Sequence, residues 1–218
     1  MFGNREQRYP SHKRGVKSAI DFEAVGGRFL QVEFDDDKGG YWQLDLTGAY
    51  EGVQSVKRTV VHLFPGFVAV LDEGNLDNEE DISLRWHTIN PAQLGSSGAF
   101  YLTNEGICLA GQIDVQTGML TDHRLMRHEY QAPFHKDRAG DLLDQRWEPY
   151  LETRLHDKHY RILSLFALVP KANAFNQWIS TNNRWAIRTQ DGDCAVHVTD
   201  KELLVSSESL NREWKVDV

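Results

Sequence analysis

The stretch VQSVKRTVVHLFPGFVAVL, residues 53–71, indicates the fold class of this protein. Two runs rich in Val, Leu and Phe flank the pair Pro65-Gly66, and β-branched and aromatic residues favour strands. Pro followed by Gly is a strong turn signal, because neither residue continues a regular strand ladder easily. We therefore predict two strands, residues 53–64 and 67–71, joined by a tight turn.

The same pattern of short apolar runs separated by Gly, Asn and Asp continues along the chain. Many short strands at regular spacing are typical of an all-β protein, and no alternation of strands with helical patterns suggests a parallel sheet. We expect a large antiparallel β-sandwich of two packed sheets, with few or no helices. Further strands are predicted at residues 16–23, 28–34, 41–46, 82–89, 99–103, 106–112, 119–124, 160–169, 185–189, 195–199 and 203–206.

The length of 218 residues fits a single β-sandwich domain over residues 1–218. Residues 133–155 interrupt the strand rhythm with a charge-rich segment, which we interpret as a long connection with one helical turn near residues 141–146. Long connections of this kind are often functional. Residues 171–218 are a candidate for a smaller C-terminal β subregion.

The formal net charge of −8 and the pI near 5.6 argue against a nucleic-acid partner, which needs clustered Lys and Arg. A local basic patch on an acidic protein can still hold an anionic ligand. The sequence contains no apolar stretch long enough to span a bilayer and no positively charged leader followed by an apolar run. Taken literally, the chain is therefore cytoplasmic and makes no membrane contact.

The residue types that carry chemistry form no compact motif. Cys108 and Cys194 lack zinc-site spacing, and they are either buried free thiols or a disulfide. The nine histidines include no HExxH or HxH arrangement, so we predict no metal site. The sequence also lacks GxSxG, P-loop and GxGxxG motifs. No residue is a candidate for catalysis.

The N-terminal segment holds the densest positive cluster, formed by Arg5, Arg8, Lys13 and Arg14. Guanidinium groups bind carboxylate and sulfate through paired hydrogen bonds, which favours an anionic-sugar surface. A solvated, frayed terminus is the alternative.

Four motifs occur in an order that resembles a known family. DLTGAY at residues 45–50, VKRTVV at 56–61, FVAVLD at 67–72 and LRWHT at 84–88 resemble, at similar spacing, the C-terminal β-sandwich of the heparinase II/III-like polysaccharide lyases. The likeness is good over residues 3–88 and vaguer beyond. It implies an α/α toroid followed by a β-sandwich, with an anionic polysaccharide between them. Such enzymes cleave by β-elimination: a base removes the C5 proton of a uronate while other groups stabilise the enolate and protonate the leaving oxygen.

The departures from that family are as informative as the matches. The family's HxHxD, DPG and HNT motifs, which supply its catalytic histidine and zinc ligands, do not occur in this sequence. The first seven residues look like the stretch that follows HNT. The resemblance therefore implies that the zinc ligands would lie upstream of Met1, that this chain holds no cofactor, and that it is inactive alone. Localisation stays unknown, although members of this bacterial family are typically periplasmic or secreted.

We therefore predict a lyase-derived sandwich that lines an anionic polysaccharide cleft. Its substrate-binding candidates are Arg5, Gln7 and Arg8, which would follow the missing catalytic strand. Its partners would be the polysaccharide and the missing toroid, and an open sheet edge invites self-association. The rival is a carbohydrate-binding module or structural domain. A binding module would present exposed aromatic residues, whereas strand alternation predicts that other aromatic residues are core. The exposed candidates are Trp147, Tyr150 and Trp178, and the core candidates are Trp42, Trp86 and Phe67.

Overall fold

The computed structural model describes residues 1–3, 5, 26–131, 135–170 and 178–218. It confirms the antiparallel β-sandwich: the strands form an eight-stranded sheet in the order β1-β2-β3-β4-β8-β7-β6-β5 and a five-stranded sheet in the order β13-β12-β11-β10-β9. In the described residues the only helical elements are two short 3-10 turns, η1 (Thr47–Ala49) and η2 (Ser96–Gly98). No helix in this part of the chain is long and apolar enough to cross a membrane.

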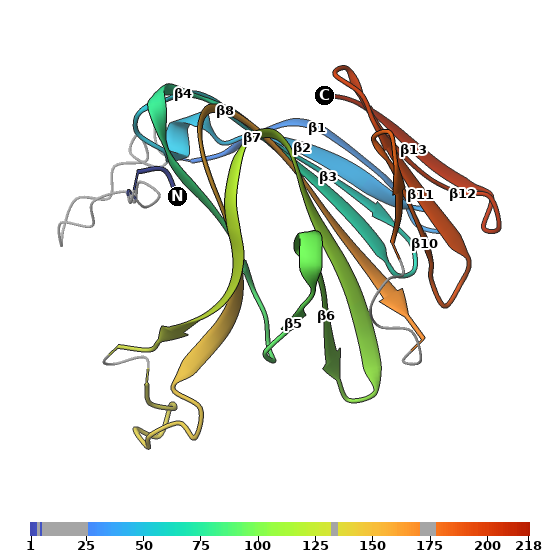
Figure 1. Ribbon diagram of the computed structural model, residues 1–218. Helices are drawn as coiled ribbons and strands as arrows, with labels where there is room; N and C mark the ends of the chain where they lie inside the picture. Colours follow the sequence, from blue (N-terminus) through green and yellow to red (C-terminus); the bar gives the residue numbers. More distant parts are fainter. Residues whose placement is uncertain (4, 6–25, 132–134, 171–177) are drawn as a thin grey trace.

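The strands of the larger sheet are β1 (Arg28–Asp35), β2 (Gly39–Asp45), β3 (Val53–Leu63), β4 (Phe67–His87), β5 (Gln93–Leu94), β6 (Ala99–Asn104), β7 (Ile107–Glu129) and β8 (Trp147–Val169). The smaller sheet contains β9 (Ile179–Thr181), β10 (Arg184–Arg188), β11 (Asp193–Val198), β12 (Glu202–Ser207) and β13 (Arg212–Asp217). In Figure 1 the smaller sheet lies along one side of the larger one.

The main hydrophobic core fills the space between the two sheets. One face of β3, β4 and β8 contributes fully buried side chains such as Leu63, Leu71 and Leu165, and these pack against Trp185 and Val196 of the smaller sheet. Each such side chain stabilises the fold by about 1.5–3 kcal/mol, because it leaves water completely. Both cysteines are free thiols buried in this core. The disulfide alternative is therefore wrong.

Three strands of the larger sheet are much longer than average and bend sharply. β4 has 21 residues, and β7 and β8 have 23 each. The β4–β8 register shifts between Asn75 and Glu80, and the β7–β8 register shifts at three places between Val115 and Asp122. Extra residues on one strand of a ladder bend that strand. Gly118, with φ of +108°, supplies one backbone conformation that a side chain would strain.

The bend divides the long strands into two parts, which form an arch in Figure 1. We call residues 67–75, 107–115 and 160–169 the body, and residues 80–87, 119–129 and 147–156 the arm. The sequence predicts separate strands at 67–71 and 82–89, and again at 106–112 and 119–124. This division is wrong, because the ladder continues through the bulges and joins each pair into one strand.

A second hydrophobic cluster lies on the inner side of the bend. Ile82 and Leu155 of the arm meet Ile113 and Ile162 of the body, and all four are at most 2% exposed. Trp86 of the arm donates a hydrogen bond of 3.2 Å from Nε1 to Ser164 Oγ of the body. The arm is therefore held against the body by packing and by a specific hydrogen bond.

The predicted connection over residues 133–155 ends nine residues too late. β8 already begins at Trp147, where WEPYLETRL alternates between the two faces of the sheet. Its charged residues suggested a loop, but they occupy only one face. Residues 141–146 contain no helical turn; a turn lies instead at residues 138–140, where the Asp137 carboxylate accepts backbone hydrogen bonds from Ala139 and Asp141.

Other predictions fall outside or beside the described elements. The strand predicted at residues 16–23 lies outside the described residues. β5, β9 and β13 were not predicted, and the smaller sheet occupies Ile179–Asp217 within the expected C-terminal stretch. Phe67 is 1% exposed, as a core residue should be. Trp42 and Trp86 are only half-buried.

Candidate functional site

The predicted substrate-binding residues are placed only in part. Arg5 lies beside the β4 bulge, where its guanidinium donates a hydrogen bond to the Glu80 carboxylate. Its backbone N–H donates to the Phe2 carbonyl at 2.7 Å. Gln7 and Arg8 lie outside the described residues. Arg5 is thus paired with Glu80, and a role in substrate binding for these three residues stays a prediction.

A partly buried ion pair lies where the arm meets the body. Arg58 of β3 and Asp72 of β4 are opposite each other in the ladder. Two parallel hydrogen bonds join them, from Nε to Oδ1 at 2.6 Å and from Nη2 to Oδ2 at 3.1 Å. The guanidinium carbon lies 5.2 Å from the centre of the Trp86 ring, within range of a cation–π contact. We call Arg58, Asp72 and Trp86 the bend cluster.

Burial dominates the electrostatics of the bend cluster. Asp72 is 5% exposed, and loss of hydration raises its pKa despite the opposing effect of Arg58. Burial also raises the pKa of Tyr160 well above its usual value, and the nearby Asp72 charge adds to the effect. Tyr160 therefore stays protonated, so it can donate a hydrogen bond but is a poor base. Its ring approaches Gly74 so closely that a Cβ there would lie 2.3 Å from it.

The cavity beside the bend cluster is too small for a sugar. It measures about 80 Å³ and is lined by residues that include Tyr50, Arg58, Asp72 and Tyr160. Small-molecule sites usually measure about 300–1,000 Å³. The polar groups of the bend are mostly engaged with one another, so this cluster stabilises the arch and offers no substrate pocket.

A second buried carboxylate lies in the arm. Glu152 of β8 is 1% exposed and stands between Arg85 of β4 and Arg124 of β7. Arg85 Nε donates to Oε1 at 2.7 Å, and Arg124 donates to Oε2 from Nη2 at 2.6 Å and from Nε at 2.8 Å. Burial alone would raise the pKa of Glu152, but hydrogen bonds from the two arginines hold it below the usual value. We call these three residues the arm clamp.

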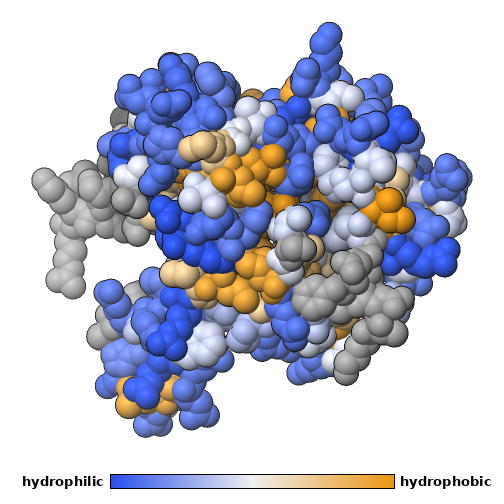
Figure 2. Space-filling model, in the orientation of Figure 1, coloured by the Kyte–Doolittle hydropathy of each residue, from blue (hydrophilic) through white to orange (hydrophobic). Residues whose placement is uncertain are grey.

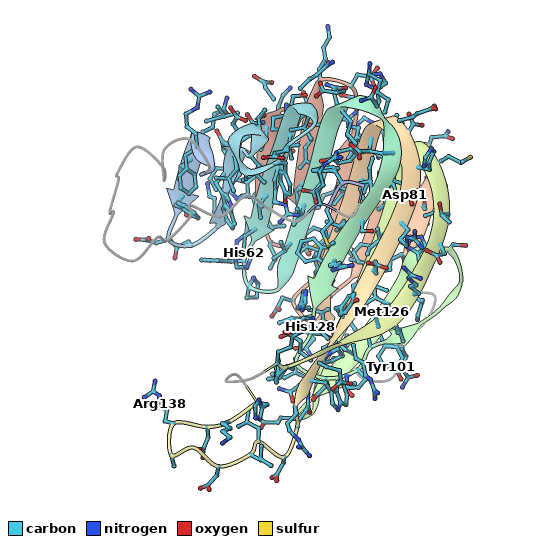
Figure 3. The ribbon with its side chains drawn as sticks, turned by 90° about the vertical axis from the view of Figure 1, so that its left-hand side faces the viewer. His62, Asp81, Tyr101, Met126, His128 and Arg138 are labelled. Carbon is cyan, nitrogen blue, oxygen red and sulfur yellow. The ribbon has the colours of Figure 1, made fainter. Side chains whose placement is uncertain are left out.

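Aromatic and imidazole rings extend the arm clamp toward the end of the arm. The Arg85 guanidinium lies 5.2 Å from the centre of the Tyr150 ring. The His87 ring stacks on the same Tyr150 ring at a centroid distance of 5.2 Å. His87 Nδ1 lies 2.9 Å from Glu148 Oε1. Figure 3 shows Met126 and His128 on the arm, with Arg138 farther out on the connection.

Two larger hollows lie at the end of the arm. An apolar groove of about 390 Å³ is lined by Thr88, Pro91, Ala92, Leu125, Met126, Arg127, Trp147, Pro149 and Tyr150. A polar basin of about 510 Å³ is lined by Arg127, Glu129, Tyr130, His135, Asp144, Arg146 and Trp147. Both fall in the size range of small-ligand sites. In the view of Figure 2, hydrophobic surface lies near the middle of the molecule, and the surface at the end of the arm is mostly hydrophilic.

The three aromatic residues considered for a binding module have different environments. Trp147 is half-buried and lines both hollows. Tyr150 lines the groove but is only 8% exposed. Trp178 packs against the inter-sheet core, with its ring centre 6.1 Å from that of Phe67. Only Trp147 among these three therefore has the position expected of a ligand-binding aromatic residue.

The histidines are dispersed over separate contacts. His156 Nδ1 lies 2.9 Å from Asp81 Oδ1, His159 Nδ1 lies 2.6 Å from Asn75 Oδ1, and His123 Nδ1 lies 2.9 Å from Thr153 Oγ1. In the part of the chain that the structure describes, no group of three or more His, Cys, Asp or Glu side chains is arranged to hold a metal ion.

The arm clamp was missed at the level of the sequence. Arg85 and Glu152 are 67 positions apart, and Glu152 and Arg124 are 28 apart. A usable signal existed only for Arg85, which stands between Leu84 and Trp86 in a predicted strand. Only the register shows that the three charged residues are opposite one another.

Comparison with known proteins bears on the fold. No family model and no curated protein sequence matches the chain. A crystal structure of heparinase III matches with a TM-score of 0.59 and 10% identity, over 88% of this chain and 27% of that protein. A second heparinase III structure matches at 0.59 and 9% identity, over 89% and 28%. Heparan sulfate lyase HepC from Pedobacter heparinus matches at 0.51 and 12% identity, over 89% and 28%.

These matches extend over nearly all of this chain but over only 27% or 28% of each neighbour. At such low sequence identity the likeness concerns the fold. The chain is therefore related at the level of the fold to a region of heparinase III and of heparan sulfate lyase.

Proposed function

We propose that this chain is the C-terminal β-sandwich portion of a heparinase II/III-like polysaccharide lyase, and that the inner side of its arch forms one wall of a cleft for an anionic, uronate-containing polysaccharide. The observation that carries this proposal is the structural likeness to heparinase III over 88% of the chain. The four resembling motifs support it independently, since they fall in β2 with η1, in β3 and at both ends of β4.

The shape of the larger sheet supports a role as a cleft wall. The arm projects from the body of the sandwich, and both hollows at its end are lined by Arg127. Cationic side chains on such a surface attract carboxylate and sulfate groups. The opposite wall would come from an α/α toroid, the partner that the family resemblance implies.

We expect the isolated chain to be inactive. β-Elimination needs a base for the uronate proton and a group that neutralises the uronate carboxylate. Tyr160 is held protonated, and Arg58, Arg85 and Arg124 already bind carboxylates of this chain. The family's zinc does not fit the described residues, which hold no cluster of suitable ligands. In such a lyase its ligands would come from residues other than the described ones.

The proposal can be tested with the purified chain and two polysaccharides, heparan sulfate and alginate. We expect no ultraviolet absorbance from an unsaturated uronate. We also expect at least one polysaccharide to slow backbone hydrogen exchange in the arm, residues 80–87 and 147–156, while β11 to β13 stay unchanged. Formation of the unsaturated product would contradict the predicted inactivity. Absence of protection by both polysaccharides would contradict the cleft wall.

A further inference from the structure

We infer that the end of the arm holds a binding subsite for one acidic sugar unit, with Trp147 as the platform and Arg127 and Arg146 as the anion-binding groups. The inference rests on the proposed function for its ligand class, a uronate or sulfated sugar. It adds a location and named residues that the family resemblance does not provide.

The ladder brings the platform and one cation to the same face of the arm. Trp147 is opposite Glu129, and Pro149 is opposite Arg127. Residues opposite each other in an antiparallel ladder, and those two positions along, share a face. The backbone N–H of Tyr130 then donates to the Arg146 carbonyl at 2.8 Å, which extends the pairing past the end of the strands. The site therefore rests on paired backbone.

The two hollows meet at Trp147 and Arg127, which line both of them. The groove beside Trp147 is mainly apolar, with Pro91, Leu125 and Pro149 among its lining residues. The basin, which Trp147 also lines, is mainly polar. A sugar ring has the same division, because its C–H groups form an apolar face and its hydroxyl and acidic groups project from the rim. An aromatic ring can pack against the C–H face of the sugar while the basin binds its hydroxyl and acidic groups.

Two arginines of the basin can bind an acidic ligand, although Glu129 and Asp144 balance their formal charge. Its lining includes the bases Arg127, His135 and Arg146 and the acids Glu129 and Asp144. Arg127 Nε lies 2.9 Å from Glu129 Oε1, and this contact leaves the terminal amino groups of the guanidinium for a second anion. Arg146 forms no ion pair with any of the described residues. A guanidinium binds a carboxylate or sulfate through paired hydrogen bonds, whereas a neutral sugar has no anionic group for such a pair.

The same arginines contribute little to folding. The side chains of Arg127 and Glu129 are 67% and 60% exposed, and exposed ion pairs stabilise proteins only slightly. Arg146 is exposed as well. Replacing these residues should therefore change binding without unfolding the arm, which makes the inference open to a clean test.

The test uses the full chain, a heparan sulfate hexasaccharide and an alginate hexasaccharide, with titration calorimetry at low salt. The double variant Arg127→Ala/Arg146→Ala should weaken binding of the preferred oligosaccharide at least about tenfold, the effect of losing one charged hydrogen bond. The matched control is Arg184→Ala/Lys201→Ala, which removes the same charge from exposed positions around the smaller sheet. The control should retain nearly the affinity of the unmodified chain.

Tryptophan fluorescence gives a second measurement. Binding should change the emission of the unmodified chain, and Trp147→Phe should remove that change while thermal denaturation shows an intact fold. Equal loss of affinity in both double variants would overturn the subsite, because it would show diffuse charge attraction. Unchanged affinity in the arm variant, together with protection of the arm by polysaccharide, would overturn the subsite and leave the proposed function standing. Failure of both oligosaccharides to bind, together with absence of polysaccharide protection, would overturn both.

Discussion

The bend cluster and the arm clamp each bury one carboxylate in the same bent sheet, yet the pKa values of the two carboxylates are shifted in opposite directions. Asp72 is paired with a single arginine, and burial raises its pKa. Glu152 is less exposed still, but two arginines lower its pKa in spite of burial. The cost of removing a carboxylate from water is thus offset only when enough charged hydrogen bonds replace that water. Glu152 accepts hydrogen bonds from two arginines and Asp72 from one, and the second arginine favours the charged form of Glu152.

The largest expected effect comes from breaking the arm clamp. Glu152→Gln should reduce the free energy of unfolding by about 3 kcal/mol, because two adjacent guanidiniums lose their shared counter-charge. Urea denaturation would measure the loss. Glu148→Gln is the matched control, since Glu148 is partly exposed and, among the described residues, pairs only with His87. A change in the control as large as that in the clamp variant would contradict the assignment.

A smaller effect is expected from loosening the contact between arm and body. Trp86→Phe removes the hydrogen bond to Ser164 and weakens the contact with Arg58. We expect a loss of about 1–2 kcal/mol in the free energy of unfolding. The double variant with Ser164→Ala provides the check: if the hydrogen bond carries the effect, adding the second change should cost less than Ser164→Ala alone.

The bend cluster should tolerate loss of its carboxylate charge better than the arm clamp does. Asp72→Asn keeps an oxygen that can accept a hydrogen bond from Arg58, and it removes a charge whose burial is costly. We expect a loss of about 1 kcal/mol or less. Equal losses from Asp72→Asn and Glu152→Gln in matched denaturation experiments would remove the distinction between the two sites.

The smallest effect is a difference in the pH dependence of stability. The folded-state pKa of Glu152 lies below its ordinary value of 4.5, so its contribution is present above that pH and is lost as the pH falls through the folded pKa. The folded-state pKa of Asp72 lies above 3.8, so stability falls as the pH rises from that value through the folded pKa. Denaturation midpoints measured in acid should therefore become less acid-sensitive in Glu152→Gln and more acid-sensitive in Asp72→Asn.

The accuracy of the strand predictions depended on how local the signal was. Residues 53–64 and 67–71 could be recognised because Pro65-Gly66 separates two apolar runs, and the structure places β3 and the start of β4 there. Residues 147–155 were missed because their charges outweighed a visible alternation. The joining of the two halves of β7 could not be seen, since a bulge has no sequence pattern distinct from that of a loop.

The candidate site was less predictable than the fold. Trp147 was identified as a candidate only under the rival hypothesis, as an exposed aromatic residue of a carbohydrate-binding module. Arg127, which lines both hollows with it, carried no signal, because an isolated arginine in a strand has no preferred role. The N-terminal arginines were predicted to bind an anionic sugar because they are close together in the sequence. Of the three predicted binding residues only Arg5 is described, and it is paired with Glu80.

By itself the sequence determined that this protein is an antiparallel β-sandwich, because alternation and turn residues act within a few positions of the chain. Only the tertiary structure decided that two of the predicted strand pairs are single bent strands, that Glu152 lies between two arginines, and that Trp147 and Arg127 share a surface. The physical reason is register. A local pattern specifies which face of a strand is apolar, but the residue opposite it is set by pairing between segments far apart in the chain.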